Sequence, residues 1–461
     1  MEREFLKTYN TELSHIRQMA GEFAREYPKI ASRLALDKEA KEICPDPFVE
    51  RLLEGFAYLT ARVQLKLDAE FPRLTQSLLE TVYPQYLARG TLLRTASERG
   101  EHVACTYRTA HPVKLWPLRI EEARYHDRSL ASLELPPDEN VEAAIRLAFR
   151  TTADLPLSEL ELDELTFFLR GADSLPATVM EHLFSACHAI WVRDADSETK
   201  HWLEVPLTEL EPVGLRNEEA MLPQDPRTFE GFRLLMEYFA FPQRFLFFRV
   251  GGLREHLKRF QGRRLELAFA LRDTDPKLAP RLNATLFDLF CTPVINLFEK
   301  RTDRIALTNR FSEYHVMVDR SRPLDYEIYS IGSVVGYGGQ TGQEQPFLPF
   351  YMAGDLHGGH TAYYTVHRKP RTLTERERRF GRLSAYSGSE VFLSLVDTQA
   401  APIAPELEQL GLSVLCTNRH LPLRLTRSDR DAEFAVEMNG PVQAVQCLSG
   451  PTVPRPSYAV G

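Results

Sequence analysis

Apolar residues recur at three- and four-residue steps at the start of the chain, which is the pattern of one helical face. In the first such run these positions are Phe5, Leu6, Tyr9, Leu13, Ile16, Ala20 and Phe23. Pro28 ends the pattern, because proline lacks the backbone N–H that a helix interior requires. The sequence therefore predicts a first helix that ends before Pro28.

A second helix is predicted to begin at Asp46 and Pro47, since Asp is favoured at the N-cap and Pro at the first helical position. Its predicted apolar face contains Phe48, Leu52, Phe56, Leu59, Val63 and Leu67. A third helix is predicted between Pro72 and Pro84. These faces can pack on one another or on the helices of another chain. The pattern does not separate the two, because both arrangements bury the same stripe.

After residue 90, short runs rich in β-branched and aromatic residues alternate with Pro, Gly and Asp, which is typical of strands. The predicted strands include residues 144–150, 165–169, 245–250, 326–331, 362–367 and 390–395. Helices are predicted at residues 177–186, 229–239 and 282–290. We therefore predict the α+β class, with an N-terminal helical segment followed by β-rich, sandwich- or barrel-like domains with intervening helices.

Three segments are predicted to form the domains. Residues 1–88 form the helical segment, residues 89–275 a β-rich mixed domain, and residues 276–461 a second β-rich domain. The last boundary is placed at residues 273–280, because the run Asp-Thr-Asp-Pro-Lys-Leu-Ala-Pro has the composition of a linker.

Composition and charge exclude several classes of protein. Of the 461 residues, 43% are apolar and 26% are charged, which is close to the globular average. The formal net charge of −8 gives no electrostatic basis for binding nucleic acid or anionic lipid. Residues 368–371 and 374–380 are locally basic, but glutamates interrupt the second run and no aromatic stacking pattern follows. We expect no binding of nucleic acid.

Cysteine usage and hydropathy indicate a reduced, cytoplasmic protein. The six cysteines are scattered and form no C-x-x-C pair, which argues against a disulfide framework and a zinc ribbon. Charges occupy the N-terminus where a signal peptide needs an apolar stretch. No run approaches the roughly 20 apolar residues that span a bilayer, so direct membrane insertion is not expected.

The search for reaction chemistry yields few candidates. A glycine-rich stretch at residues 332–342 lacks the Lys-Ser/Thr and the following helix of a phosphate loop, and we interpret it as a flexible loop. Gly388-Ser389 lacks the second glycine of a nucleophile elbow. We expect no catalytic residues and no cofactor.

One cluster supports an alternative function as a metal-dependent enzyme. Asp355, His357 and His360, with His367 beyond, have side chains that bind zinc or iron, and Gly358-Gly359 lets the chain turn back. The glycines exclude a helical H-E-x-x-H motif, and a solvated loop is the competing interpretation. A further alternative is a stand-alone ligand-binding β-domain protein.

Several sequence motifs resemble those of one known family. They include Asp46-Pro-Phe-Val-Glu-Arg, Gly231-Phe-Arg-Leu-Leu-Met-Glu-Tyr-Phe and Cys291-Thr-Pro-Val-Ile-Asn. Others lie at residues 67–87, 107–117, 322–327, 388–395 and 416–422. Together they run in family order along nearly the whole chain, and the sequence is similar to the TssF (VasA/ImpG) baseplate proteins of type VI secretion systems. Family members contain a stretch between the counterparts of Ala88 and Arg89 and a region after Gly461, which we expect this sequence to omit.

The resemblance implies a structural subunit of the baseplate wedge and no reaction. Such a subunit assembles with TssG, TssK, TssE and a second TssF copy around the VgrG hub, and initiates assembly of the tail tube and sheath. It implies a cytoplasmic baseplate docked to the inner-membrane complex. For contact with a partner chain we expect the stripe Phe5, Tyr9, Leu13 and Ile16 on the first helix.

Overall fold

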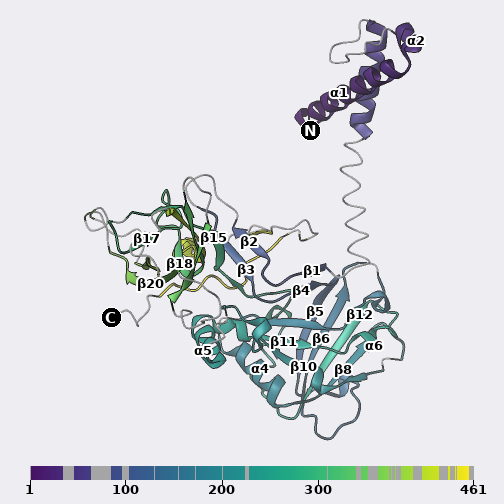
Figure 1. The fold of residues 1–461 in the computed structure, drawn as a ribbon. Coiled ribbons are helices and arrows are strands. Elements are labelled where there is room, and N and C mark those ends of the chain that lie inside the picture. Colours follow the sequence, from purple (N-terminus) through teal and green to yellow (C-terminus); the bar gives the residue numbers. More distant parts are fainter. Residues whose placement is uncertain are drawn as a thin grey trace. The chain divides into compact units, whose positions relative to one another are not determined.

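The protein is represented by a computed structural model that divides into two compact units, Met1–Tyr83 and Pro84–Gly461, shown in Figure 1. The residues that the structure describes are 2–34, 46–63, 85–95, 103–128, 130–153, 155–171, 173–199, 201–223, 228–308, 310–338, 344–350, 362–372, 375, 379, 386–397, 407–424, 434–436, 442 and 444–455. Helices come first and sheets follow, which confirms the predicted α+β class.

The N-terminal unit contains the two helices that the apolar spacing predicts. Helix α1 (Glu2–Glu26) ends before Pro28, which opens the short helix α2 (Pro28–Ala31) and the 3-10 turn Ser32–Leu34. Residues 47–63 form the second long helix, and Asp46 Oδ1 accepts a hydrogen bond from the Phe48 N–H at 2.8 Å. The predicted N-cap is therefore confirmed. The third predicted helix and Leu67 lie outside the described residues.

Two antiparallel sheets of the second unit form a sandwich. The five-stranded sheet has the order β5 (Leu118–His126), β6 (Ala143–Thr151), β12 (Arg264–Leu271), β8 (Cys187–Asp194) and β9 (Leu203–Val205). The four-stranded sheet has the order β10 (Leu210–Val213), β11 (Phe247–Val250), β7 (Leu165–Leu169) and β13 (Phe287–Leu289). Ring centroids meet across the sheets at 6.0 Å for Phe149 and Phe167 and at 6.1 Å for Phe248 and Phe269. This aromatic layer is part of the largest hydrophobic core.

Short helices cover the sandwich. Helix α4 (Leu175–Ser185) buries Val179 and Leu183 against the core and confirms the helix predicted at residues 177–186. Helix α5 (Glu230–Ala240) confirms the one predicted at 229–239. The remaining helical turns are α6 (Arg254–Leu257) and the 3-10 segments Leu130–Leu133, Leu157–Glu159, Leu207–Glu209, Asn217–Glu219, Pro242–Phe245, Ala284–Leu286 and Leu421–Arg424.

The helix predicted at residues 282–290 is wrong. The segment forms the 3-10 turn Ala284–Leu286, whose N-cap Asn283 accepts from the Thr285 N–H, and then strand β13. Strand β13 pairs with β7, so the backbone of Phe287 bonds across the sheet. Short apolar runs fit either period, and here the partner strand decides the outcome.

A large sheet later in the chain curls around a core of its own. Its order is β15 (Phe298–Arg301), β22 (Leu407–Thr417), β18 (Glu327–Gly338), β19 (Glu344–Pro349), β20 (Ala362–Pro370), β21 (Ser389–Asp397) and β17 (Tyr314–Val316), with β16 (Ile305–Ala306) pairing to β22. The buried residues Val334, Phe347, Tyr364, Leu393 and Leu412 come from five successive strands. Their common side forms the second core.

The glycine-rich stretch interpreted as a loop is in part a strand. Gly332, Gly336 and Gly338 belong to β18, while Gly339 and Gly342 lie outside the described residues. A Cβ at Gly332 would approach the Ser413 carbonyl at 3.3 Å, so the close partner strand β22 favours glycine there. The flexible-loop interpretation is thus wrong for these three glycines.

Strands from both halves of the second unit share sheets. Strands β14 (Val294–Ile295), β3 (Thr106–Thr109), β2 (Leu92–Thr95) and β23 (Phe434–Val436) form one sheet, and β1 (Gln85–Leu87) pairs with β4 (Val113–Leu115). Within the predicted linker 273–280, Leu278 is 1% exposed and the Asp275 N–H donates to Tyr125 Oη at 2.7 Å. The linker interpretation is therefore wrong, although the three-part domain division itself stays a prediction.

Candidate partner-binding surfaces

The stripe expected to contact a partner lies between the two helices of the N-terminal unit. The Phe5 ring meets Tyr58 of helix 47–63 edge-on at 5.4 Å between centroids. Leu13 is buried, while Phe5, Tyr9 and Ile16 are half-buried. These four residues therefore pack in part within their own chain, and their contact with a partner stays a prediction.

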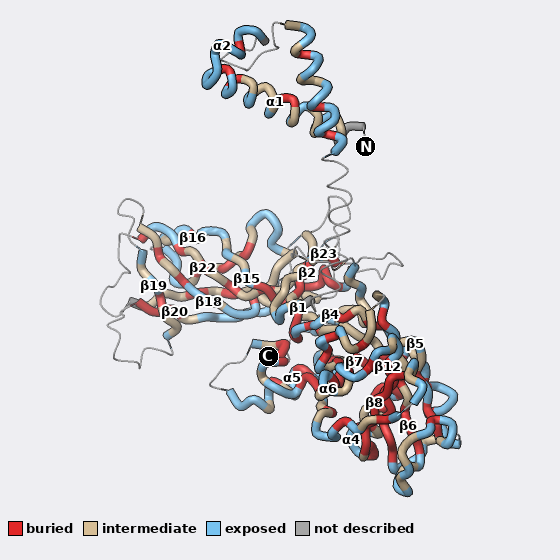
Figure 2. Tube along the Cα trace, turned by 90° about the vertical axis from the view of Figure 1, so that its right-hand side faces the viewer, coloured by how far each residue is buried: buried red, intermediate tan, exposed pale blue. Residues whose placement is uncertain are grey.

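Helix 47–63 turns its small residues inward and its large apolar residues outward. Ala57 and Ala61 are fully buried, and buried Glu50 forms an ion pair with Arg17 of α1. The large residues are 54–86% exposed, and we name them the N-terminal stripe: Phe48, Leu52, Phe56, Leu59 and Val63. In Figure 2 the N-terminal unit shows only scattered buried positions. The predicted apolar face therefore exists, and among the described residues of this unit it is exposed.

A second exposed apolar set lies on α5. The residues are 56–75% exposed, and we name them the α5 stripe: Phe229, Phe232, Leu235, Met236 and Phe239. Four of them follow a 3-4-3 spacing, which places them along one side of a helix. The charged residues Arg233 and Glu237, in contrast, are 7% and 2% exposed. The helix thus has its charged side buried and its apolar side in solvent.

A buried ion network fixes this orientation of α5. Glu237 Oε1 accepts hydrogen bonds from the N–H groups of Met221 and Leu222 at 3.0 and 2.9 Å. Its carboxylate also forms ion pairs with Arg233 and with Arg244, which is completely buried. Burial lowers the pKa of Arg244 to about 10, so it remains charged at neutral pH. Charged hydrogen bonds of this kind resist rotation of the helix.

The loop before α5 is part of the same network. Arg244 donates to the carbonyl of Gly214 and to that of Glu219, the latter at 3.2 Å. Glu219 Oε2 accepts from the Gly214 N–H at 2.6 Å. Gly214 has a φ of 108°, and a Cβ there would meet the Arg244 carbonyl at 3.1 Å, so the turn requires glycine.

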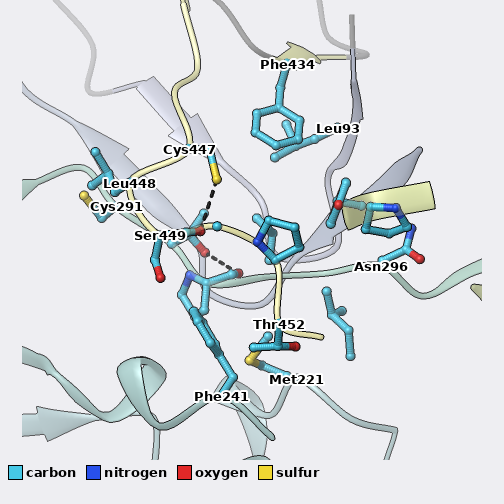
Figure 3. A pocket seen from close by; sticks show the side chains of 18 of the residues that line it. Leu93, Met221, Phe241, Cys291, Asn296, Phe434, Cys447, Leu448, Ser449 and Thr452 are labelled. Carbon is cyan, nitrogen blue, oxygen red and sulfur yellow. Dashed lines mark hydrogen bonds between the residues drawn. The ribbon is translucent and has the colours of Figure 1, made fainter. Parts of the chain in front are cut away.

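A cavity of about 900 Å³ lies beside the end of α5, and its walls are mostly apolar (Figure 3). Phe241, Cys291, Phe434 and Leu448 are among the residues that line it. The buried Tyr107 hydroxyl also borders it and has no hydrogen-bond partner among the described residues. If the chain were a ligand-binding β-domain protein, which is the alternative function, its ligand would bind in this cavity.

Four of the cysteines do not supply a reactive group at neutral pH. Burial raises the pKa of Cys105, Cys187, Cys291 and Cys416 to about 12, so these thiols stay protonated. The thiolate is the form that acts as a nucleophile or metal ligand. No disulfide joins the five cysteines that the structure describes, and Cys44 lies outside that part of the chain.

The metal-dependent alternative remains untested. Asp355, His357 and His360 lie outside the described residues, and His367 is exposed on β20. Where the structure places side chains, no group of three His, Cys, Asp or Glu residues is arranged to hold a metal ion. Within the same residues, no helix is both long enough and apolar enough to cross a membrane.

Comparison with known proteins gives the family of the chain. The family model described as "Type VI secretion system, TssF" matches residues 1–89 and 87–461. A protein of Pseudomonas aeruginosa described as type VI secretion system component TssF1 is 45% identical over 490 aligned positions, which cover 100% of this chain and 78% of that protein. The chain belongs to the TssF family. The predicted family is confirmed.

One solved structure shows the same fold. A chain of a TssK–TssF–TssG baseplate subcomplex of a type VI secretion system, determined by cryo-electron microscopy, aligns with a TM-score of 0.58 at 23% identity. The alignment covers 89% of this TssF chain and 76% of the other. A type VI baseplate complex also matches, with a TM-score of 0.42 and 21% identity over 97% and 76% of the two chains.

Sequence reasoning missed the α5 stripe as a surface. The apolar residues of α5 were visible in the sequence, but they predict equally well a helix that packs on the core. The available signal was Arg233 and Glu237 on the opposite side, four residues apart. Their burial depends on Arg244 and on the Gly214 loop, which the local pattern does not show.

Proposed function

We propose that this chain is a structural subunit of the type VI baseplate wedge, assembling with TssG, TssK, TssE and a second TssF copy around the VgrG hub. In this role it initiates assembly of the tail tube and sheath, in a cytoplasmic baseplate docked to the inner-membrane complex. Family membership supports the system, and the solved subcomplex that contains a TssF chain together with TssK and TssG supports the first two partners.

The observation that carries the proposal is the N-terminal stripe. Its five residues lie at positions 48, 52, 56, 59 and 63, so they form one continuous helical face. Complete burial contributes about 1.5–3 kcal/mol for each large apolar side chain. More than half of each residue is still exposed, so covering the stripe would contribute on the order of 5 kcal/mol before the costs of association. A helix of TssG is the occupant that we propose.

The role is structural and not catalytic. The two sheet cores provide rigid bodies, and the charged groups near α5 are engaged in buried ion pairs. Ion pairs and hydrogen bonds also engage the basic residues of β20: Arg368 donates to the Ile328 carbonyl at 2.8 Å, and Lys369 pairs with Glu313 at 2.7 Å. We therefore propose that the chain transmits force between its partners, fixes their positions and performs no reaction.

Co-purification with TssG tests the proposed function. The double variant Leu52→Asp/Phe56→Asp places two charges on exposed positions of the N-terminal stripe and should abolish recovery of TssG, because buried unpaired charges are costly. Thr60→Asp, exposed on the same helix outside the stripe, is the matched control and should recover TssG as the parental chain does. Failure of the parental chain to recover TssG, or equal recovery by the double variant, would refute the proposal.

A further inference from the structure

The α5 stripe is as large as the largest apolar patches that monomers usually expose. Phe229, Phe232 and Phe239 are 74%, 62% and 75% exposed, which corresponds to on the order of 400 Å² at roughly 200 Å² for each aromatic side chain. Leu235 and Met236 raise the total to about 600 Å², the upper end for a typical monomer. Such a patch marks a site of contact with another protein.

The chain cannot relieve this exposure by turning α5 over. Rotation of the helix would move Arg233 and Glu237 into solvent and separate Glu237 from the buried Arg244. It would also break the bonds from Glu237 to the Met221 and Leu222 N–H groups. Because removal of one partner from a buried ion pair is strongly destabilising, the outward orientation of the stripe is fixed.

The pattern of the stripe suits a second helix that runs antiparallel to α5. Positions 229, 232, 236 and 239 follow the 3-4-3 spacing of residues that interlock across a helix pair. In an antiparallel pair of identical helices, Phe229 of one copy faces Phe239 of the other, and Phe232 faces Met236. Each layer then pairs an aromatic side chain with another large apolar side chain.

Charge and area favour a second copy of this chain as the occupant. Two identical charged surfaces would repel each other, but the α5 stripe contains no ionisable side chain, and the neighbouring Glu230 is hydrogen-bonded to Asn217. Burial of about 600 Å² on each copy gives about 1,200 Å² in total, which is the lower end for a stable interface. Two copies are therefore sufficient to cover each other.

We propose that two copies of this chain pair through antiparallel contact of their α5 stripes, around a two-fold axis near the middle of the helix. The pairing is isologous, so each copy contributes the same residues. This proposal rests on the proposed function, in which a second TssF copy is one of the partners. Its test uses the isolated chain, so that failure of pairing and failure to recover TssG are separate results.

Sedimentation velocity of the full chain across a concentration series tests the pairing. The parental chain should dimerise. Phe232→Glu and Met236→Lys should each raise the dimer dissociation constant at least tenfold, because loss of a central apolar contact weakens binding by about that factor or more. Phe311→Glu is the matched control, because Phe311 is also exposed, at 65%, but lies outside the stripe. This control should dimerise as the parental chain does.

An equimolar mixture of the two single variants tests the antiparallel register. In the mixed dimer, Glu at position 232 faces Lys at position 236 in one layer, and the other layer keeps its native Phe and Met. The mixture should therefore recover dimer that neither variant forms alone. A monomeric parental chain, a dimer unaffected by both substitutions, or a mixture that stays monomeric would each overturn the proposal, and binding of the stripe by TssG or TssK alone would replace it.

Discussion

Helix 47–63 and α5 both present large apolar side chains outward, but different chemistry attaches them to their units. Helix 47–63 contacts α1 through the ion pair of Glu50 with Arg17 and through the rings of Tyr58 and Phe5, and its Ala57 is fully buried. Helix α5 is attached to a sandwich through Arg233, Glu237 and Arg244, all buried. Among the described residues, the buried apolar side chains of the first unit are Leu13 and four alanines, whereas the sandwich beneath α5 contains the largest hydrophobic core.

The difference teaches that an exposed apolar stripe alone does not define how rigid a binding surface is. A stripe on a weakly attached helix pair is expected to become ordered when a partner covers it, and part of the interaction energy then orders the helices. A stripe held by buried ion pairs on a sandwich is already positioned.

The largest effect is expected from removing Arg244. Arg244→Met leaves the buried Glu237 without its main counter-charge and should lower the free energy of unfolding of the second unit by about 3–5 kcal/mol. Urea denaturation measures the change. Lys258→Met is the control, because it removes an exposed ion pair with Glu255, and it should leave the midpoint unchanged. Equal effects of the two substitutions would show that the network beneath α5 is not stabilising.

The pH dependence of stability reports on the same region. Burial and the charge of Arg244 lower the pKa of His111 to about 4, compared with about 6.5 in an unfolded chain. Between these pH values His111 binds a proton in the unfolded chain but not in the folded one. The contribution of neutral His111 to the stability of the folded state is therefore complete above pH 6.5 and is lost as the pH falls to about 4. The loss amounts to about 3 kcal/mol.

His111→Asn removes this titration and tests its assignment. Urea denaturation at several pH values should show a shallower loss of stability between pH 6.5 and 4 in the variant than in the parental chain. The comparison of slopes matters, because the substitution also changes packing against Phe247, which affects all pH values alike. Parallel curves for the two proteins would contradict the role of His111.

An intermediate effect is expected from enlarging the contact between the N-terminal helices. Ala57 is fully buried between helix 47–63 and the rest of its unit, so Ala57→Leu introduces volume that the contact lacks. Overpacking of this kind costs about 1–3 kcal/mol. Hydrogen exchange of the full chain should accelerate in residues 2–34 and 47–63 and stay unchanged in α5. Acceleration in α5 as well would remove the distinction between the two attachments.

The smallest effect is expected at the start of helix 47–63. Asp46→Ala removes the acceptor of the Phe48 N–H and should cost about 1 kcal/mol. Hydrogen exchange should therefore accelerate only in the first turn of this helix, and Asp46→Asn, which keeps the acceptor oxygen, should preserve the parental rate. The same acceleration in both variants would mean that the cap does not stabilise the helix.

Local signals in the sequence predicted the elements better than their surroundings. The N-cap at Asp46 and the break at Pro28 depend on neighbouring residues alone, and the structure confirms both. The segment that contains Phe287 formed a strand because β7 lies beside it, and that neighbour is more than a hundred residues away in sequence. Predictions therefore succeeded where the cause was local.

The orientation of the apolar faces was not predictable for the same reason. The N-terminal stripe and the buried Ala57 and Ala61 lie on one helix, and the apolar pattern alone favours burial of the larger residues. On α5, burial of Glu237 depends on Arg244 and on the backbone of Met221. These tertiary contacts decide which face remains for a partner.

Hydrogen exchange of this TssF chain, alone and bound to TssG, tests whether the N-terminal stripe is the surface that TssG covers. TssG should slow exchange in residues 47–63, while the sandwich core should keep its rate. Bound TssG with unchanged exchange in residues 47–63 would show that the stripe is not its binding surface.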